Sequence, residues 1–303
     1  MHVVIAGGSG FLGSKLQKQL LEKGYHVSVL TRSPEKVGKS SGLSVVEWLV
    51  EGARPEEQLG QVDAFVNLAG ETINGIRWTG RKKEKILQSR LAATKEVIRL
   101  IGKLEQKPEV LINASAVGYY GMSETGSFTE DTKSAATDFL ANVVKKWESQ
   151  AKEAEQLGVR TVLVRLGLIL GREGALPLMA LPYKLGVGGT VGSGRQWVSW
   201  IHGEDAARLI EFAITKSSLS GPVNATAPEP VQMKEFGMTL GSVLDRPHWL
   251  PVPEWLLKIL LGEMSSMLIR GQRVVPEKAL EHQFVFAYPN LELALKEIFD
   301  NNR

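Results

Sequence analysis

Apolar and polar positions follow two alternating patterns along the first two-thirds of the chain. Short continuous apolar runs have the length of buried strands, and between them lie longer stretches whose apolar residues recur on one helical face. The short runs predict strands at His2–Ala6, Val27–Leu30, Leu43–Trp48, Ala64–Leu68, Val110–Ser115 and Thr161–Gly167. The longer stretches predict helices at Gly13–Lys23, Gly80–Leu104 and Thr137–Gln156. This alternation predicts right-handed βα units and an α/β fold, a Rossmann-type doubly wound parallel sheet.

The pattern changes after Gly171. A glycine-rich stretch over 186–194 precedes two tryptophans, and a helix at Glu204–Lys216, a strand at Val223–Ala227 and a mainly helical tail follow. We therefore expect residues 1–170 to form the Rossmann domain, with contributions from 196–228. Residues 171–303 are expected to form a smaller α+β carboxyl-terminal substrate lobe, which includes a module at about 248–298.

Composition and charge restrict the partners. The 36 basic and 33 acidic residues give a formal charge of only +3, so nothing in the charge predicts binding to nucleic acid. The chain has no cysteine, and its five histidines are not paired at ligand spacing, so we expect no metal site. The apolar run at 255–261 is far shorter than the ~20 residues that span a bilayer, and no basic leader precedes the first strand. We therefore expect a cytoplasmic protein that does not enter a membrane.

The most informative motif is the glycine-rich turn at residues 7–13, which directly follows the first predicted strand and directly precedes the first predicted helix. In this context glycines allow a tight turn, a close approach to a pyrophosphate and close packing of helix on sheet. The amino terminus of the helix adds free N–H groups and a positive dipole end. The turn therefore predicts a dinucleotide site whose contacts are Gly7, Ser9, Gly10, Phe11, Leu12 and Gly13.

The end of the second predicted strand indicates which dinucleotide binds. An acidic side chain usually stands there when NAD is preferred, because it accepts hydrogen bonds from the ribose hydroxyls. This chain instead has Thr31 and Arg32 at that position. A guanidinium suits a 2′-phosphate, so we expect NADP(H); the alternative is that Arg32 is a solvated loop cation.

The fourth predicted strand ends at Leu68, Ala69 and Gly70, where the small residues let the backbone approach the adenosine side of the cofactor. With the glycine turn, this DAFVNLAG segment, Ser115 within ASAVGYYG, and the WIHGEDAA segment at 200–207, the chain resembles the short-chain dehydrogenase/reductase superfamily. It is most similar to the extended branch of nucleotide-sugar epimerases and dehydratases. The segments GSGRQW, NATAP and GQRVVP resemble one subgroup of epimerase-family proteins of unknown substrate with a distinctive carboxyl-terminal module.

The resemblance implies further site residues. It makes Arg90 a cofactor contact, although the neighbouring arginine and lysines also fit a surface position. It places Ser115 at the serine position of the active site, next to the cofactor. Gly167 and Ile169, which follow the sixth predicted strand, complete the expected cofactor contacts.

The usual acid and base of this superfamily are missing. Its hydride-transferring members use a tyrosine four residues before a lysine, whose cation lowers the pKa of the tyrosine. The alignment on Glu148 places Leu140 and Val144 at these two positions, and no Tyr-x-x-x-Lys sequence occurs anywhere in the chain. The standard alcohol–ketone chemistry therefore lacks its proton donor.

Other residues are candidates for the empty role. Either Tyr119 or Tyr120, which follow the strand of Ser115, could donate a proton; the alternative is that one of them packs and the other lines the pocket. Arg195, in the glycine-rich loop, suits an anionic group of a substrate, but it could also brace the loop through an ion pair. His202 and Trp200 are candidate substrate contacts, with a packing role as the alternative for each.

The carboxyl-terminal module offers Arg270 and Arg273 in a region that could close over the cleft. Its apolar helix at about 256–261 is either a packing face against the main domain or a surface for a homodimer. The sequence does not decide between these two roles.

Two functions remain. One is an NADP(H)-dependent oxidoreductase or nucleotide-sugar epimerase with a non-standard active site, which acts on a small, anionic or nucleotide-linked substrate. The other is a non-catalytic protein that binds NADP(H) and regulates a partner, since an intact cofactor turn with a lost catalytic pair is the pattern that such a role predicts.

Overall fold

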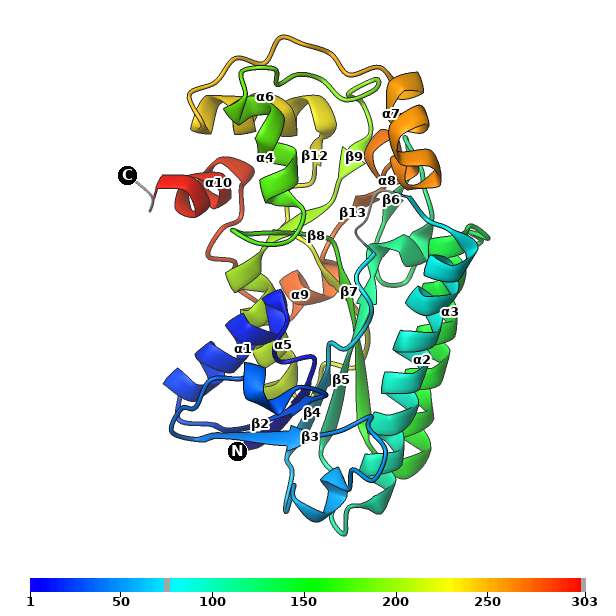
Figure 1. Cartoon of the computed structure of the whole chain (residues 1–303), viewed down its shortest axis with the longest axis vertical. Coiled ribbons are helices and arrows are strands. Elements are labelled where there is room, and N and C mark those ends of the chain that lie inside the picture. The colour runs from blue at the N-terminus through cyan, green and yellow to red at the C-terminus, as the bar shows by residue number, and fades with distance from the viewer. Residues whose placement is uncertain (74–76, 301–303) are drawn as a thin grey trace.

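A computed structural model describes residues 1–73 and 77–300 of the chain, and a parallel sheet forms its centre (Figure 1). The sheet has seven strands in the order β11-β7-β5-β4-β1-β2-β3. Their bounds are β1 His2–Ala6, β2 His26–Thr31, β3 Leu43–Glu47, β4 Ala64–Asn67, β5 Val110–Ala116, β7 Arg160–Leu166 and β11 Gly221–Ala225. Every pairing in it is parallel, which confirms the predicted Rossmann-type α/β fold.

Helices cover both faces of the sheet. On one side lie α1 (Phe11–Glu22) and α5 (Gly203–Thr215), and on the other lie α2 (Gly80–Lys103) and α3 (Phe139–Ala151) (Figure 1). Alternate residues of β1 enter different cores, since Val3 and Ile5 pack in the α1–α5 layer and Val4 and Ala6 pack in the α2 layer. This explains why the strand reads as a continuous apolar run.

Three predicted elements differ from the structure by two or more residues at an end. The helix predicted over Gly13–Lys23 begins two residues earlier, as α1. The helix predicted over Thr137–Gln156 is α3 at Phe139–Ala151, followed by the 3₁₀ segment η4 at Lys152–Leu157. It begins at Phe139 because the Asp138 carboxylate accepts hydrogen bonds from the N–H groups of Leu140 and Ala141, which makes Asp138 the cap. The last predicted strand begins two residues earlier, as β11, and joins the main sheet beside β7.

A second group of elements lies at one end of the sheet (Figure 1). Helices α4 (Leu176–Lys184), α6 (Met233–Val243) and α10 (Leu291–Asp300) surround a third core that contains Trp200 and Phe236. The remaining helical elements are η1 Pro34–Lys36, η2 Pro55–Glu57, η3 Val117–Tyr120, α7 Glu254–Leu261, η5 Gly262–Ser265, α8 Ser266–Ile269 and α9 Glu277–Glu281. The short strands are β6 Ser127–Phe128, β8 Leu168–Leu170, β9 Trp197–Val198, β10 Trp200–His202, β12 Val231–Gln232 and β13 Arg273–Val274.

The short strands connect distant parts of the chain. They form three two-stranded sheets, β8 with β10, β9 with β12 and β6 with β13. The last of these ties the carboxyl-terminal segment to the loop that follows β5. Among the described residues, no helix is long and apolar enough to cross a membrane.

Candidate functional site

The glycine turn lies between β1 and α1, as predicted. Gly7 has a φ of +81°, which favours glycine, and a methyl group at Gly13 would lie only 2.2 Å from the carbonyl oxygen of Gly7. The backbone at Gly10, ahead of α1, is extended, and the first turn of the helix carries no acidic side chain. The N–H groups of this turn can therefore bind an anion, and the site fits a pyrophosphate.

The side chains within the turn have separate roles. Leu12 is buried in the sheet core, so only its backbone can face a cofactor. The ring of Phe11 packs against Gly171, where a methyl group would lie 2.4 Å from it. Ser9 and Gly10 are exposed at the mouth of the turn.

Thr31 and Arg32 lie at the end of β2, next to this turn in the sheet. Thr31 is buried, and its hydroxyl accepts a hydrogen bond from the N–H of Ser33 at 3.1 Å. Arg32 is exposed, and its guanidinium makes no hydrogen bond or ion pair within the described part of the chain. The fixed turn thus presents a cation with no competing carboxylate, as binding of a 2′-phosphate requires.

A buried hydrogen-bond network holds the end of β4. The side-chain amide of Asn67 donates to Asn113 Oδ1 at 2.7 Å and to Thr94 Oγ1 at 2.9 Å. The indole of Trp147 also donates to Thr94 Oγ1, and the side-chain oxygen of Asn67 accepts from the N–H of Ala69 at 3.2 Å. The network links β4, β5, α2 and α3, so Leu68, Ala69 and Gly70 leave the sheet on a fixed path.

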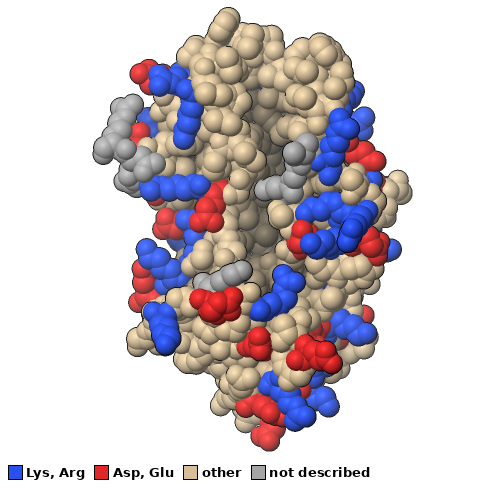
Figure 2. All heavy atoms as spheres, in the orientation of Figure 1, with Lys and Arg blue, Asp and Glu red and all other residues tan. Residues whose placement is uncertain are grey.

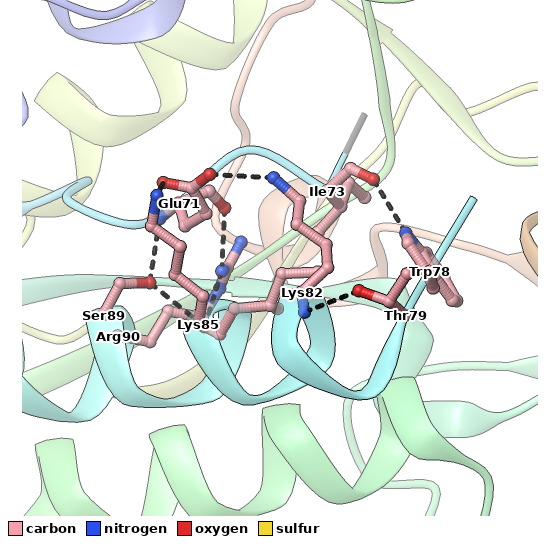
Figure 3. Close-up of polar contacts among 9 residues, drawn as sticks. Glu71, Ile73, Trp78, Thr79, Lys82, Lys85, Ser89 and Arg90 are labelled. Carbon is pink, nitrogen blue, oxygen red and sulfur yellow. Dashed lines mark hydrogen bonds and ion pairs between the residues drawn. The ribbon is translucent and has the colours of Figure 1, made fainter. Parts of the chain in front are cut away.

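Arg90 lies beside this loop and not on an open surface. Its guanidinium donates to the carbonyl oxygens of Glu71 and Ile86, both at 3.0 Å (Figure 3). It also lies 5.1 Å from the ring centroid of Trp147, and burial lowers its pKa. A side chain at Gly70 would meet Arg90 at 3.2 Å. Arg90 therefore packs against the loop that follows β4, and its contact with a cofactor stays a prediction.

Two lysines of α2 also bind the loop that follows β4, through the carboxylate of Glu71. Lys82 binds the Glu71 carboxylate at 2.8 Å, and Lys85 lies 3.7 Å from it (Figure 3). These cations lower the pKa of Glu71, with the hydrogen bond from Lys82 as the largest cause. The hydroxyl of Ser89 accepts from the N–H of Glu71 at 2.9 Å. Side chains of α2 thus fix the loop by both its backbone and its carboxylate.

At the predicted active-site serine, the structure shows a buried ion pair that the sequence reading missed. The Ser115 hydroxyl donates to Glu148 Oε1 at 2.6 Å. Arg165 binds the same carboxylate through two hydrogen bonds of 2.8 and 2.9 Å. All three residues are buried, so the predicted active-site serine lies against a paired charge. A charged residue inside the apolar strand VLVRL was the signal for Arg165.

Arg165 also organises the two tyrosines. It donates to the Tyr120 hydroxyl at 2.9 Å, and that hydroxyl donates to Asn224 Oδ1 at 2.7 Å. Tyr120 is buried, and desolvation raises its pKa to about 12. Tyr119 is half-buried, and the Arg165 guanidinium lies 3.5 Å from its ring centroid. Tyr120 therefore packs, whereas Tyr119 keeps partial access to solvent.

Leu140 and Val144 lie on α3, on the side that faces this centre. Val144 is buried, and Leu140 helps to line a cavity of about 440 Å³. The cavity lies between the first turn of α3 and the α7–α8 segment of the carboxyl-terminal module. Its walls include Trp78, Met122, Phe139, Lys258, Ile269 and Arg270. Among the residues that line the cavity, only Leu140 and Arg270 had been identified from the sequence.

The predicted substrate residues are not brought together at this cavity. Trp200 is fully buried in the third core, where its indole donates to the carbonyl oxygen of Glu229, so it cannot contact a substrate in this structure. His202 is 3% exposed, and its ring accepts from the N–H of Glu204 at the start of α5 and pairs with Glu297 at 3.0 Å. These contacts are the ones expected if His202 has a packing role and does not bind a substrate.

Arg195 and the residues after β7 lie elsewhere. Arg195 is exposed on the 192–196 loop and does not line the cavity. Gly167 packs tightly against the carbonyl oxygen of Ser199, and Ile169 pairs with Ile201 of β10. Within the described residues, no three His, Asp or Glu side chains are grouped so as to hold a metal ion.

Known proteins share this architecture over the full chain. The epimerase family protein YfhF of Bacillus subtilis is 48% identical over 303 residues, which cover 100% of this chain and 99% of the relative. The epimerase family protein SH2119 of Staphylococcus haemolyticus is 42% identical over 98% of each chain. The crystal structure of the human epimerase family protein SDR39U1 with NADPH superposes with a TM-score of 0.87 at 33% identity, covering 99% of this chain and 100% of that one.

Two family models divide the chain between them. Residues 252–298 match a domain of unknown function, DUF1731, which corresponds to the α7–α10 region. Residues 3–225, from β1 to β11, match the NAD dependent epimerase/dehydratase family. By this match and by its relatives, the chain belongs to the NAD-dependent epimerase/dehydratase family and has the DUF1731 carboxyl-terminal module.

Proposed function

We propose that this protein is an NADP(H)-dependent oxidoreductase or epimerase that acts on a small molecule through a non-standard active site. The proposal rests on two features at the carboxyl ends of β1 and β2, a glycine turn and an unpaired arginine. A glycine turn that tolerates no side chain at Gly13 lies next to a β2 end that presents Arg32 without a competing carboxylate. The NADPH present in the crystal structure of the human relative supports the same cofactor.

The cofactor would supply or accept a hydride, and the chain must move the accompanying proton. Tyr119 is our candidate for this role, since its half-buried ring is held against Arg165 and Tyr120 close to Ser115. The Ser115 hydroxyl donates its hydrogen bond to the Glu148 carboxylate, so the serine oxygen is left to accept a hydrogen bond from a substrate. Leu140 lines the neighbouring cavity with an apolar side chain that cannot exchange a proton.

The cofactor part is tested by NADPH fluorescence during titration of the protein. We expect saturable binding that is tighter than that of NADH. No binding, or a preference for NADH, would refute the assignment.

The catalytic part is tested by incubating the protein with NADPH and a panel of carbonyl compounds and sugar nucleotides. We expect sustained NADPH oxidation that is abolished in Tyr119→Phe and reduced in Ser115→Ala. Turnover that survives in Tyr119→Phe would remove Tyr119 from the mechanism.

One observation favours a non-catalytic role as the second candidate. The tyrosine and lysine positions hold Leu140 and Val144, and the serine is engaged by Glu148. A protein that only senses NADP(H) would bind it and show no turnover with the panel. Its proteolysis pattern would nevertheless change when the cofactor is added.

A further inference from the structure

A cavity lies between the first turn of α3 and the α7–α8 segment of the carboxyl-terminal module. Its volume of about 440 Å³ falls in the lower part of the range of small-molecule sites, ~300–1,000 Å³. Figure 2 shows one face of the molecule, which is hollowed along its middle and has mostly uncharged residues in the visible part of that hollow. The chemistry of the walls therefore restricts what can bind.

The walls nearest the catalytic centre are apolar. Trp78 and Phe139 meet edge to face, with ring centroids 5.6 Å apart. Leu140, Met122 and Ile269 add further apolar surface. Such walls favour a flat or flexible apolar body and offer few partners for sugar hydroxyls.

The charged side chains that line the cavity differ in whether they already bind a partner within the protein. Asp138 caps α3 through two hydrogen bonds, and Glu263 forms an ion pair with Lys83. Lys258 lies 3.5 Å from Glu254 on its own helix. Arg270 is exposed at the cavity, and its guanidinium makes no hydrogen bond or ion pair with any residue that the structure describes. The hydroxyls of Ser265 and Ser266, which also line the cavity, donate to the carbonyl oxygens of Gly262 and Glu263. Arg270 is thus an unpaired cation at a hollow whose carboxylates and hydroxyls are already engaged.

The segment that carries Arg270 is held in place by α2 and by the residues just before it. Besides the pair of Lys83 with Glu263, the Arg77 guanidinium donates to the carbonyl oxygens of Ile259 and Leu260 at the end of α7. These contacts satisfy carbonyl groups that the helix leaves free and bring α7 and α8 over the cavity. Arg270 therefore belongs to a wall with a defined position.

We propose that this cavity binds a small monoanion with an aromatic or alkyl body, whose carboxylate pairs with Arg270. This assignment rests on the proposed function, since it names the class of its substrate. A nucleotide sugar does not match the walls, because its diphosphate and hydroxyl groups require several polar partners. A carboxylate on an apolar body matches both the single free guanidinium and the apolar walls.

Calorimetric titration of the NADPH-saturated protein tests the assignment. The probes are trans-cinnamate and hexanoate, their neutral counterparts cinnamyl alcohol and hexanol, and UDP-glucose. We expect each acid to bind about tenfold or more tightly than its alcohol, as a charged hydrogen bond contributes about 1.5–3 kcal/mol. UDP-glucose should not displace the acids.

Three variants test whether the acids bind in this cavity. Arg270→Gln should remove the preference for acid over alcohol, whereas Phe139→Ala should weaken both. Arg246→Gln, an exposed arginine that does not line the cavity, is the matched control and should change neither. Circular dichroism checks that each variant is folded.

Three results would overturn the assignment: equal binding of acid and alcohol, displacement by UDP-glucose, or an unchanged preference in Arg270→Gln. Failure of every acid to bind would overturn it as well. NADPH titration of the same samples separates the two proposals. If NADPH binds and the acids do not, only the ligand class is wrong. If NADPH does not bind, the proposed function fails, and titration of the acids without NADPH still tests the cavity.

Discussion

The two sides of the candidate site are built in different ways. The glycine-turn side is made of consecutive residues, 7–13, whose backbone forms the contact surface. The cavity side takes its walls from the segment before α2, the loop after β5, the first turn of α3 and the α7–α8 segment, and there side chains form the contact surface. The first side depends on local sequence, whereas the second depends on how distant segments pack.

This difference in construction bears on which binding properties a protein family can share and which can vary between its subgroups. A backbone site can be kept by a few glycines, so it specifies a type of cofactor over a large family. A side-chain cavity changes with each substitution in any of its segments, so it can specify a different ligand in each subgroup. Variants can test whether the two sides are as independent as this comparison implies.

The largest effect is expected at the ion pair between the two sides. Glu148→Gln leaves Arg165 buried without a countercharge, and breaking such a pair costs about 3–5 kcal/mol. We expect a clear fall in the free energy of unfolding, measured by urea denaturation. Arg54→Gln, which breaks an exposed pair with Glu57, is the control and should cost less than about 1 kcal/mol. Equal losses in the two variants would show that the buried pair is not important for stability.

The next largest effect is expected at the turn. Gly13→Ala would force a methyl group to within 2.2 Å of the Gly7 carbonyl oxygen, so the turn must move. We expect NADPH affinity to fall about 100-fold, which corresponds to about 2.7 kcal/mol. Gly80→Ala introduces a methyl group with no atom within 4 Å and should bind normally. If the sides are independent, Gly13→Ala will still bind trans-cinnamate.

A smaller effect is expected at Arg32. Arg32→Gln should weaken NADPH binding about tenfold and leave NADH binding unchanged, because only NADPH carries the 2′-phosphate. The ratio of the two dissociation constants, from fluorescence titration, measures the effect. A parallel loss for both cofactors would mean that Arg32 contacts a group that they share.

The smallest effect is expected from pH. Burial lowers the pKa of His202 below 6.5, although Glu297, Asp205 and Glu204 oppose the shift. The unfolded chain therefore takes up a proton more readily, so the stability that neutral His202 contributes is complete above pH 6.5 and is lost as pH falls through the folded pKa. His202→Asn keeps a capping side chain on α5, and its free energy of unfolding should depend less on pH between 7 and 5. Identical slopes for the two proteins would contradict this account.

The sequence predicted the sheet and the glycine turn because both depend on local pattern. β1 and α1 are adjacent along the chain, and the glycines at 7 and 13 are required by contacts within the turn itself. The end of α3 was overextended, because apolar periodicity continues into η4 while the hydrogen bonding changes to the tighter 3₁₀ type.

The cavity and the ion pair could not be predicted in the same way. Glu148 and Arg165 lie on different elements, and nothing in the spacing of the chain shows that they meet. The sequence made Trp200 a candidate substrate contact, with a packing role as the alternative, and β10 directs it into a core formed with α4, α6 and α10. Assignments that need two distant segments to be placed together require the structure.

The position of β11 has a consequence for synthesis of the chain. β7 pairs with β5 on one side and with β11 on the other, and β11 is reached only after fifty-four further residues, 167–220. Until residue 225 has left the ribosome, β7 is an unprotected edge that other strands can pair with. A fragment that ends near residue 170 would keep the whole glycine turn, yet we expect it to aggregate. Production of the cofactor-binding half alone should therefore extend at least through Ala225.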